Sequence, residues 1–438
     1  MRKTRWIAFL LIAVLLLGGC AANTEEDWGN NSTGLGNVVI PSGENAEQTP
    51  ENPSEQTPEQ SPENPTGQPS EQSPEQTPEQ TPGQGGGQNP QQPSSPSPEQ
   101  PSQNPNESVS DSEGVDLSKD VRFFGRTYEQ NGTYYFNWTE SGFEFTFNGT
   151  GAEATFETGT FSEANTPYIY ILVDGKRVQQ PVAITDSMQT VTLCEGLKKG
   201  NHTVRVVKRT NARSTPLGVM DITLLKNGVI QSPPAAKERR IEFIGDSITV
   251  GYGTLGDAST SSWSTLTEDG SCTYAALTGQ ALKAEYNVVA ISGRGLAHNT
   301  GGDTDKLMPS LYPMLDEYNH PGVKWDFTKF KPHVVVVNLA TNDHATSSDA
   351  EVTTAATAFL KDIRKYNPDA HIIVAYGLMG KQKEAALKSA VSAVKDSKTT
   401  FLALPQATAK VLGHPDKASH QAASKVLQAE IKKITGWK

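Results

Sequence analysis

Residues 241–249 read IEFIGDSIT, an apolar run that leads directly into glycine, aspartate and serine. It is the first of five short apolar runs, at 241–244, 288–291, 334–339, 372–376 and 401–404. Helical periodicity occupies three of the stretches that follow, at 350–366, 383–394 and 421–434. Because runs that are apolar on both faces and alternate with helices form parallel sheets covered on both sides, we predict an α/β domain over residues 235–438. Ligands of such domains bind at the carboxyl ends of the strands.

Reactive residue types follow three of these runs. Ser247 stands at a strand-to-helix turn, where its hydroxyl and its own N–H lie at the positive end of a helix. Gly293 follows the second run, and a glycine lets a backbone N–H approach a substrate closely. Asn342 follows the third run with an amide that can donate to an oxyanion, and His414 precedes the last helix. Each residue alone is typical of a turn or cap, so the prediction of a nucleophile, an oxyanion site and a base depends on their occurring together.

In this order, the blocks Gly-Asp-Ser, Gly, Asn and His-Pro resemble those of the SGNH, or GDSL-like, hydrolases, from about residue 238 to 438. The resemblance implies a three-layer SGNH hydrolase fold with a parallel sheet. It implies that Ser247 attacks an ester carbonyl while His414 accepts and returns the proton. The oxyanion would lie on the N–H groups of Ser247 and Gly293 and on the side chain of Asn342. No metal and no other cofactor is implied.

Two positions depart from the pattern of these hydrolases. Most of them place an aspartate two or three residues before the histidine, where this chain has Leu412 and Val411. We therefore expect a Ser-His dyad whose imidazole is oriented by a backbone carbonyl, and we interpret Asp416 as a helix N-cap. Ala340 replaces the usual glycine before Thr-Asn-Asp, and we expect this methyl group to reduce activity or alter specificity.

The region ahead of the α/β part has the period-two pattern of strands. Residues 143–147 read FEFTF, and similar runs at 168–173, 190–193, 203–207 and 222–224 are separated by turn signals such as Asn148-Gly149 and Asp174-Gly175. Many short strands at close spacing predict an all-β jelly-roll or β-sandwich domain, which we place at residues 118–230.

Several short segments are similar to those of carbohydrate esterase family 2, in which a jelly-roll domain precedes the SGNH domain. They are Gly125-Arg126-Thr127, Trp138, Phe143-Glu144-Phe145, Val173-Asp174-Gly175, Glu195-Gly196-Leu197, His202-Thr203-Val204, Lys208-Arg209-Thr210 and Ala290-Ile291-Ser292-Gly293-Arg294-Gly295-Leu296. The resemblance implies a carbohydrate O-acetylesterase that acts on polysaccharides such as acetylated xylan or glucomannan. Two alternatives stay open: an esterase of O-acetylated peptidoglycan or exopolysaccharide, and a non-catalytic carbohydrate-binding surface protein.

The N-terminal part has the features of an export signal and a spacer. Residues 1–20 contain three basic residues, an apolar run and Leu17-Gly18-Gly19-Cys20, which resembles the lipobox of bacterial lipoproteins and implies lipidation of Cys20. Residues 21–117 are rich in Pro, Glu, Gln and Ser, so we predict a disordered stalk. We therefore expect a lipid-anchored protein on the extracellular face of the membrane, in a Gram-positive bacterium.

The charge balance argues against nucleic-acid binding. The net charge is -11, and residues 41–110 hold 11 of the 49 acidic residues with no Lys or Arg. The other residues are neutral overall, so they lack the excess of basic charge that phosphate binding needs. The expected partners are an acetylated polysaccharide and, through the lipid anchor only, a membrane. The sequence does not indicate an oligomeric state.

Six further residues receive weaker assignments. Tyr252, Trp263, Trp325 and His298 are candidates for a sugar platform, although we favour ordinary packing for each. We interpret Asp246 and Asp343 as loop-structuring residues that bind backbone N–H groups.

Overall fold

The computed structural model describes residues 114–438, and the predicted signal segment 1–20, Cys20 and the predicted stalk up to residue 113 lie outside them. The described chain begins slightly earlier in the all-β domain than expected. Leu117 is buried in the core of that domain, and Val115 packs against the same core. These residues lie just before the predicted domain start at residue 118.

The all-β domain consists of two antiparallel sheets. One has the strand order β1-β4-β10-β6-β7, with β12 beside β4 and β8 beside β6, and the other has the order β2-β3-β11-β5-β9. The bounds are β1 (Arg122–Phe124), β2 (Tyr128–Gln130), β3 (Thr133–Tyr135), β4 (Gly142–Gly149), β5 (Ala152–Thr158), β6 (Tyr168–Val173), β7 (Lys176–Arg177), β8 (Val182–Ala183), β9 (Met188–Cys194), β10 (Gly200–Lys208), β11 (Leu217–Leu224) and β12 (Val229–Gln231), with a short 3-10 helix at Glu163–Asn165.

Strand β4 shows why the alternating pattern forms this domain. Phe143, Phe145 and Phe147 are fully buried and point into the core between the sheets. Phe143 lies opposite Val206 and Phe145 opposite Val204 on β10, so the apolar faces of the two strands coincide. Cross-strand pairs of this kind stabilise a sheet and fix its register. The prediction of an all-β domain is confirmed.

The second part is a parallel α/β domain with five strands in the order β14-β13-β17-β18-β19. The bounds are β13 (Arg240–Gly245), α1 (Ser247–Val250), a 3-10 helix (Gly270–Cys272), α2 (Tyr274–Ala281), β14 (Glu285–Ala290), α3 (Met308–Leu311), β15 (Met314–Asp316), β16 (His320–Lys324), β17 (Val334–Asn338), α4 (Asp349–Tyr366), β18 (His371–Tyr376), α5 (Glu384–Val394), β19 (Thr399–Ala403), β20 (Lys410–Val411), β21 (His414–Pro415) and α6 (Lys417–Thr435).

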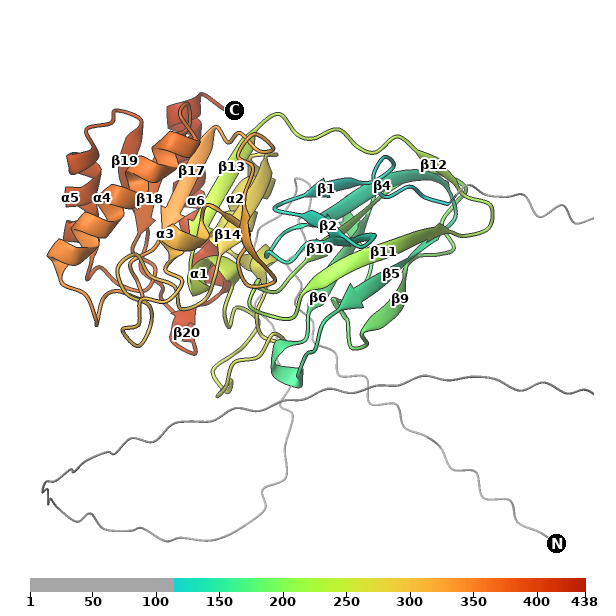
Figure 1. The fold of residues 1–438 in the computed structure, drawn as a ribbon, viewed down its shortest axis with the longest axis horizontal. Helices are drawn as coiled ribbons and strands as arrows, with labels where there is room; N and C mark the ends of the chain where they lie inside the picture. The colour runs from blue at the N-terminus through green and yellow to red at the C-terminus, as the bar shows by residue number, and fades with distance from the viewer. Residues whose placement is uncertain (1–113) are drawn as a thin grey trace, which may run out of the picture. The chain divides into compact units, whose positions relative to one another are not determined.

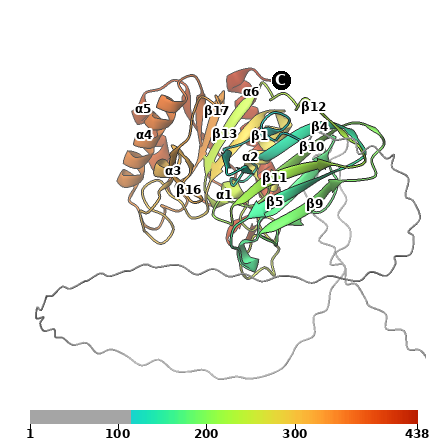
Figure 2. The same ribbon diagram turned by 45° about the vertical axis from the view of Figure 1, so that its right-hand side comes forward.

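Helices cover both faces of the parallel sheet (Figures 1 and 2). Along β17, Val335 and Val337 pack with α4 and α5. Val334 and Val336 pack with α2 and α6 on the other face. Because successive side chains of a strand point to opposite faces, a continuous apolar run is what a doubly covered strand requires. The predicted five strands and three long helices are all present.

The strand order fixes where the site forms. β13 lies between β14 and β17, so the chain leaves β13 in one direction along the sheet for β14 and returns past it for β17. A reversal of this kind opens a crevice at the carboxyl ends of the two central strands. The residues that follow β13, β14 and β17 therefore meet at one edge of the sheet.

The two domains share buried contacts. Arg126 is 1% exposed and donates through Nη1 to the carbonyls of Tyr312 and Met314, both at 2.6 Å. Its guanidinium also lies within 6 Å of four aromatic rings, which include Trp138 and Trp325. Trp138 in turn donates to the Leu315 carbonyl at 2.8 Å. Two of the segments that resemble carbohydrate esterase family 2, at Arg126 and Trp138, thus lie in the interface between the domains.

Within residues 114–438, no helix combines the length and the apolar character needed to cross a bilayer.

Candidate active site

Ser247 lies at the tight turn between β13 and α1. Asp246 is the N-cap of α1, and its carboxylate accepts a hydrogen bond from the N–H of Ile248 at 3.0 Å. A Cβ atom at Gly245 would lie 2.0 Å from Thr249 Oγ1, so only glycine fits ahead of this turn. Ser247 is 5% exposed. No described residue accepts a hydrogen bond from its backbone N–H, which remains available to a ligand.

His414 reaches Ser247 from the far end of the chain. Its Nε2 lies 2.7 Å from Ser247 Oγ, and its Nδ1 lies 3.0 Å from the Leu412 carbonyl oxygen. Because a carbonyl only accepts, Nδ1 carries the proton in neutral imidazole and Nε2 presents its lone pair to the serine hydroxyl. The structure therefore brings the expected serine and histidine together, with a backbone carbonyl behind the imidazole.

A β-hairpin with a two-residue turn positions His414. β20 and β21 pair antiparallel with Val411 opposite His414, and the intervening Leu412 and Gly413 have φ values of 51° and 78°. Two left-handed residues in a two-residue loop are typical of the type I′ turn that matches the twist of a hairpin. The first of them, Leu412, supplies the carbonyl that orients the imidazole.

The surroundings of His414 favour its neutral form. Burial lowers the pKa of His414 below its usual value, and the hydrogen bond to the Leu412 carbonyl opposes that shift only in part. The ring of Tyr252 lies 4.3 Å from the imidazole, centroid to centroid, at a tilt of 30°. A neutral imidazole beside a serine hydroxyl is the form that acts as a general base.

The loop after β14 supplies the second expected oxyanion donor. Gly293 has a φ of 82°, a conformation that residues with a side chain rarely adopt. Its carbonyl accepts from the N–H of Thr300 at 2.9 Å. Among the described residues, none accepts from the N–H of Gly293. This donor, like that of Ser247, is available to a substrate oxygen.

Asn342 is held in one amide orientation. Thr300 Oγ1 donates to its Oδ1 at 2.5 Å, and its Nδ2 donates to the Arg294 carbonyl at 2.8 Å. The remaining contact of Nδ2, to Asp246 Oδ2, is 3.4 Å long and therefore weak. A stronger acceptor can replace it, so one N–H of this amide is suited to a developing oxyanion.

Asp343 fixes the loop that carries Gly293. Its two carboxylate oxygens accept from the backbone N–H groups of Leu296, Ala297 and His298 at 2.6 to 3.0 Å. Asp246 binds the start of α1 in a similar way, and burial raises its pKa to about 7. Both aspartates have the loop-structuring contacts expected from the sequence. Asp416 likewise caps α6 by accepting from the Ser419 N–H at 3.0 Å, as predicted.

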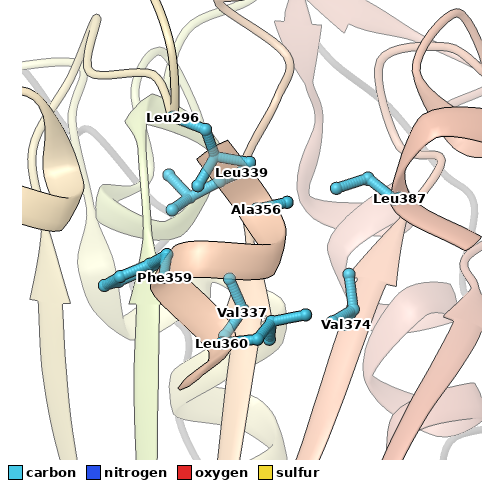
Figure 3. A pocket seen from close by; sticks show the side chains of 8 residues that line it. All are labelled: Leu296, Val337, Leu339, Ala356, Phe359, Leu360, Val374 and Leu387. Carbon is cyan, nitrogen blue, oxygen red and sulfur yellow. The ribbon is translucent and has the colours of Figure 1, made fainter. Parts of the chain in front are cut away.

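Ala340 shows why glycine is usual at its position. It has a φ of 82° and is fully buried, so a residue with a Cβ adopts a left-handed conformation here at some cost in strain. The neighbouring Leu339 and, from the loop after β14, Leu296 point into the apolar space beneath α4, around a cavity of about 10 Å³ (Figure 3). These leucines anchor both oxyanion loops to the core.

The candidate sugar-platform residues have different surroundings. Trp325 is buried against Arg126, so it belongs to the domain interface. Tyr252 lies between His414 and Trp263, whose ring stacks on it at 5.6 Å and 13°. His298 Nδ1 lies 2.9 Å from Ser347 Oγ. Of these candidates, Tyr252 lies directly against His414, and Trp263 stacks on Tyr252.

Sequence reasoning missed two residues beside the oxyanion loops. Thr300 bridges Gly293 and Asn342, and Arg213 of the all-β domain donates to the Ser292 carbonyl at 3.3 Å. Neither residue carries a local pattern, because the side chains of Thr300 and Arg213 bond residues 42 and 79 positions away in the chain. The resemblance of Lys208-Arg209-Thr210 to carbohydrate esterase family 2 was the nearest signal, since that segment begins the loop that carries Arg213.

Comparisons with known proteins cover both domains. The "Carbohydrate esterase 2 N-terminal" family matches residues 123–234, and the "GDSL-like Lipase/Acylhydrolase family" matches residues 243–435. The cellulase/esterase CelE of Acetivibrio thermocellus is 35% identical over 315 residues, which are 68% of this chain and 38% of CelE. An acetylxylan esterase/glucomannan deacetylase of Cellvibrio japonicus is 32% identical over 218 residues, which are 49% of this chain and 57% of that protein. The chain thus spans less than two thirds of either relative.

A solved structure covers the same two domains. It is a family two carbohydrate esterase from Clostridium thermocellum in complex with cellohexaose, and it is 32% identical with a TM-score of 0.68. The match covers 73% of this chain and 100% of the solved one. Since the likeness extends through the whole of that esterase, this chain belongs to carbohydrate esterase family 2.

Proposed function

We propose that this protein is a carbohydrate O-acetylesterase that removes acetyl groups from polysaccharides such as acetylated xylan or glucomannan. The observation that carries the proposal is the 2.7 Å contact between His414 Nε2 and Ser247 Oγ. Asn342 contacts Asp246, the residue before Ser247, and bonds to Arg294, the residue after Gly293. Two relatives support the substrate class, because one is named an acetylxylan esterase/glucomannan deacetylase and another was solved with cellohexaose.

The first half of the reaction forms an acetyl-enzyme. Ser247 Oγ attacks the acetyl carbonyl carbon while its proton passes to His414 Nε2. The carbonyl oxygen becomes an oxyanion that accepts from the N–H groups of Ser247 and Gly293 and from Asn342 Nδ2. Collapse of this intermediate breaks the bond to the sugar oxygen, which takes the proton from His414 and leaves as the free hydroxyl.

The second half repeats the steps with water. His414 removes a proton from water, which attacks the acetyl carbon, and the same oxyanion donors stabilise the intermediate. Ser247 leaves with the proton from His414, and acetate is released. The Leu412 carbonyl keeps the tautomer correct throughout, although it carries no full charge to stabilise the imidazolium. In serine proteases, loss of the charge of the corresponding aspartate lowers kcat about 10⁴-fold. We therefore expect this dyad to depend strongly on the orientation of the His414 imidazole.

The test is acetate release from acetylated xylan and acetylated glucomannan by the purified protein. Ser247→Ala and His414→Ala should each lower the rate of release by several orders of magnitude. Ser389→Ala on the exposed side of α5 and His333→Ala just before β17 are matched controls, since both lie away from the strand ends that form the site. If the wild type binds these polymers but releases acetate no faster than Ser247→Ala, the protein is a carbohydrate-binding protein instead.

The substrate panel also includes O-acetylated peptidoglycan and an O-acetylated exopolysaccharide. The ranking of kcat/KM across the panel identifies the substrate, because specificity is the ratio of these values. We expect the plant polysaccharides to rank first. A higher value on peptidoglycan would assign the enzyme to the cell wall.

For the location, we propose a lipid-anchored enzyme on the extracellular face of the membrane. Leu17-Gly18-Gly19-Cys20 after a basic and apolar segment supports this assignment. In a Gram-positive host fed a labelled fatty acid, the wild type should carry the label and Cys20→Ala should not. A label retained by Cys20→Ala would place the lipid elsewhere.

A further inference from the structure

A loop of the all-β domain reaches the oxyanion side of the active site. Residues 209–216 connect β10 to β11, and Arg213 near the middle of the loop is exposed. Arg213 Nη1 lies 3.3 Å from the Ser292 carbonyl oxygen and 4.0 Å from the position that a Cβ on Gly293 would occupy. In the described part of the chain, no carboxylate forms a salt bridge with Arg213.

Buried polar contacts hold this loop in place. Lys208 is fully buried, and its Nζ donates to the carbonyls of Thr210 and Asn211 at 2.8 and 2.9 Å. Asn211 donates through its backbone N and its side chain to the buried carboxylate of Glu268, at 2.7 to 3.1 Å. Its own Oδ1 accepts from the N–H of Arg213 at 2.7 Å. Buried charges are costly unless they are fully bonded, so this network fixes the backbone from which the exposed guanidinium projects.

The Ser292–Gly293 peptide needs such a partner. Gly293 lacks a side chain that would restrict its φ and ψ, so steric effects alone do not fix the direction of its N–H. The carbonyl of Gly293 is held by Thr300, but that bond orients the following peptide unit. Among the described residues, Arg213 provides the one hydrogen bond to the Ser292 carbonyl.

The geometry of a trans peptide links the two ends of this unit. The C=O of Ser292 and the N–H of Gly293 lie in one plane and point in opposite directions. A donor that holds the carbonyl from one side therefore directs the N–H to the other side, toward the substrate. Because the donor is a cation, it also polarises the amide, and hydrogen bonds that are linked through one group strengthen each other.

We propose that Arg213 is a positioning residue of the oxyanion hole, supplied by the all-β domain, that fixes and polarises the Ser292–Gly293 peptide. The inference rests on the proposed function, since it concerns the oxyanion of ester hydrolysis. It also gives the all-β domain a part in the chemistry. The competing assignment is a direct contact between Arg213 and the sugar, and a substrate without a sugar separates the two.

The experiment uses 4-nitrophenyl acetate, which has the acetyl ester but no sugar. Arg213→Met removes the donor and the charge, whereas Arg213→Lys keeps a charged donor on a shorter side chain. We expect Arg213→Met to lower kcat about tenfold and to leave KM within twofold of the wild-type value. This loss in kcat is smaller than the 10²- to 10³-fold loss that follows removal of a direct oxyanion donor. Arg213→Lys should recover part of the loss.

A second readout reports on the tetrahedral state itself. A small boronic acid forms a tetrahedral adduct with a serine hydroxyl, so its affinity should fall by the same factor as kcat in Arg213→Met. Arg240→Met is the matched control. Arg240 donates through Nε to one backbone carbonyl, that of Lys331 at 2.8 Å, at the opposite end of β13 from Ser247. Its kcat and boronate affinity should equal those of the wild type.

The outcomes separate the claims. An active wild type whose kcat on 4-nitrophenyl acetate is unchanged in Arg213→Met overturns the positioning role. A rise in KM for acetylated polysaccharide alone would then assign Arg213 to sugar binding. A wild type without esterase activity contradicts the proposed function itself. Arg213 is exposed, so all its variants should have the wild-type midpoint of denaturant unfolding. A lower midpoint, together with a higher KM and a lower kcat, would indicate that Arg213 has only a structural role.

Discussion

At the scale of single residues, the proposed Ser247–His414 dyad differs from a serine-protease triad in what lies behind the imidazole. The Leu412 carbonyl sets the tautomer of His414, but among residues 114–438 no carboxylate bonds to the ring to raise its pKa. Burial acts in the opposite direction and lowers that pKa. The base is therefore available in more acidic solution than an unperturbed histidine would be.

The pH profile follows from this shift. If His414 is the proposed general base, its neutral form is the active one, so kcat/KM should rise with pH through the pKa of the free enzyme and then level off. Since that pKa is lowered from its usual 6.5, the midpoint of the acid limb should lie below pH 6.5. The check is kcat/KM on 4-nitrophenyl acetate from acid to neutral pH. A midpoint above 6.5 would point to a carboxylate partner that the described contacts do not include.

Asp416 offers a test of whether any nearby carboxylate takes part. As the N-cap of α6 it contributes stability, so Asp416→Ala should lower the free energy of unfolding by about 1 kcal/mol. Asp416→Asn, which keeps a capping side chain, should lose less. Both variants should retain kcat/KM within a few-fold. Denaturant unfolding and steady-state kinetics measure the two effects, and a loss of kcat/KM near 10⁴ in a folded Asp416→Asn would make Asp416 part of the catalytic machinery.

Much of the candidate site could be predicted at this scale because each residue follows a recognisable strand or block. Ser247, Gly293, Asn342 and His414 stand where the pattern placed them, and the structure brings them to one edge of the sheet. The φ of Ala340 could not be predicted from composition, since it depends on how the β17 loop leaves the sheet. The usual glycine at this position was the available hint.

At the scale of elements, the β20–β21 hairpin sets the orientation of His414, the proposed base. Its turn residues, Leu412 and Gly413, both have positive φ. Space around a Cβ at Gly413 is open, so the cost of a side chain there comes from backbone strain alone. Gly413 is therefore accessible to mutation without disturbing any packed neighbour.

Paired turn variants test the hairpin. Gly413→Ala should strain the turn by about 1 kcal/mol and shift His414. A catalytic group displaced by about 1 Å can lose about 10²-fold in rate, so kcat should fall by roughly tenfold or more. Leu412→Asn should keep near wild-type kcat, because Asn-Gly is a preferred type I′ pair and the carbonyl remains. The measurement is kcat on 4-nitrophenyl acetate. Equal rates in the two variants would show that the turn does not control the dyad.

The elements that sequence reasoning missed share a physical cause. Helix α2 is buried on most of its faces and so lacks an amphipathic stripe, and β20 and β21 are two residues each. A fully packed short helix and a two-residue strand both lack the hydrophobic periodicity from which strands and long helices are predicted. By contrast, β17 begins with the continuous apolar run Val334–Val337, and α4 has both a capping box and an apolar face.

At the scale of the whole molecule, residues 114–438 form two domains that share buried structure. Trp138 and Ala212 of the all-β domain belong to the same core cluster as α4 and the parallel sheet. Glu140 of the all-β domain accepts from the Tyr286 hydroxyl at 2.8 Å. The Glu140–Tyr286 bond joins residues 146 positions apart, so no local pattern predicted it and the sequence suggested two domains joined near residue 230.

The buried carboxyl of Glu140 gives this interface a pH dependence. Burial raises its pKa from 4.5 to about 7, so folding favours the protonated form. Its contribution to stability is full below pH 4.5 and is lost as pH rises through 7, by on the order of 3 kcal/mol. Glu140→Gln removes this titration, so the free energy of unfolding should fall less steeply between pH 4.5 and 7 than in the wild type. Denaturant titrations across that range provide the check, and parallel slopes would contradict the assignment.

A double-mutant comparison of kcat for acetate release tests most directly whether Ser247 and His414 act as one unit. Groups that act together are strongly non-additive, so Ser247→Ala, His414→Ala and the double variant should all fall to a similar residual rate, on the order of 10⁴ or more below the wild type. Losses that multiply in the double variant, or a wild-type rate no higher than that of Ser247→Ala, would contradict the dyad.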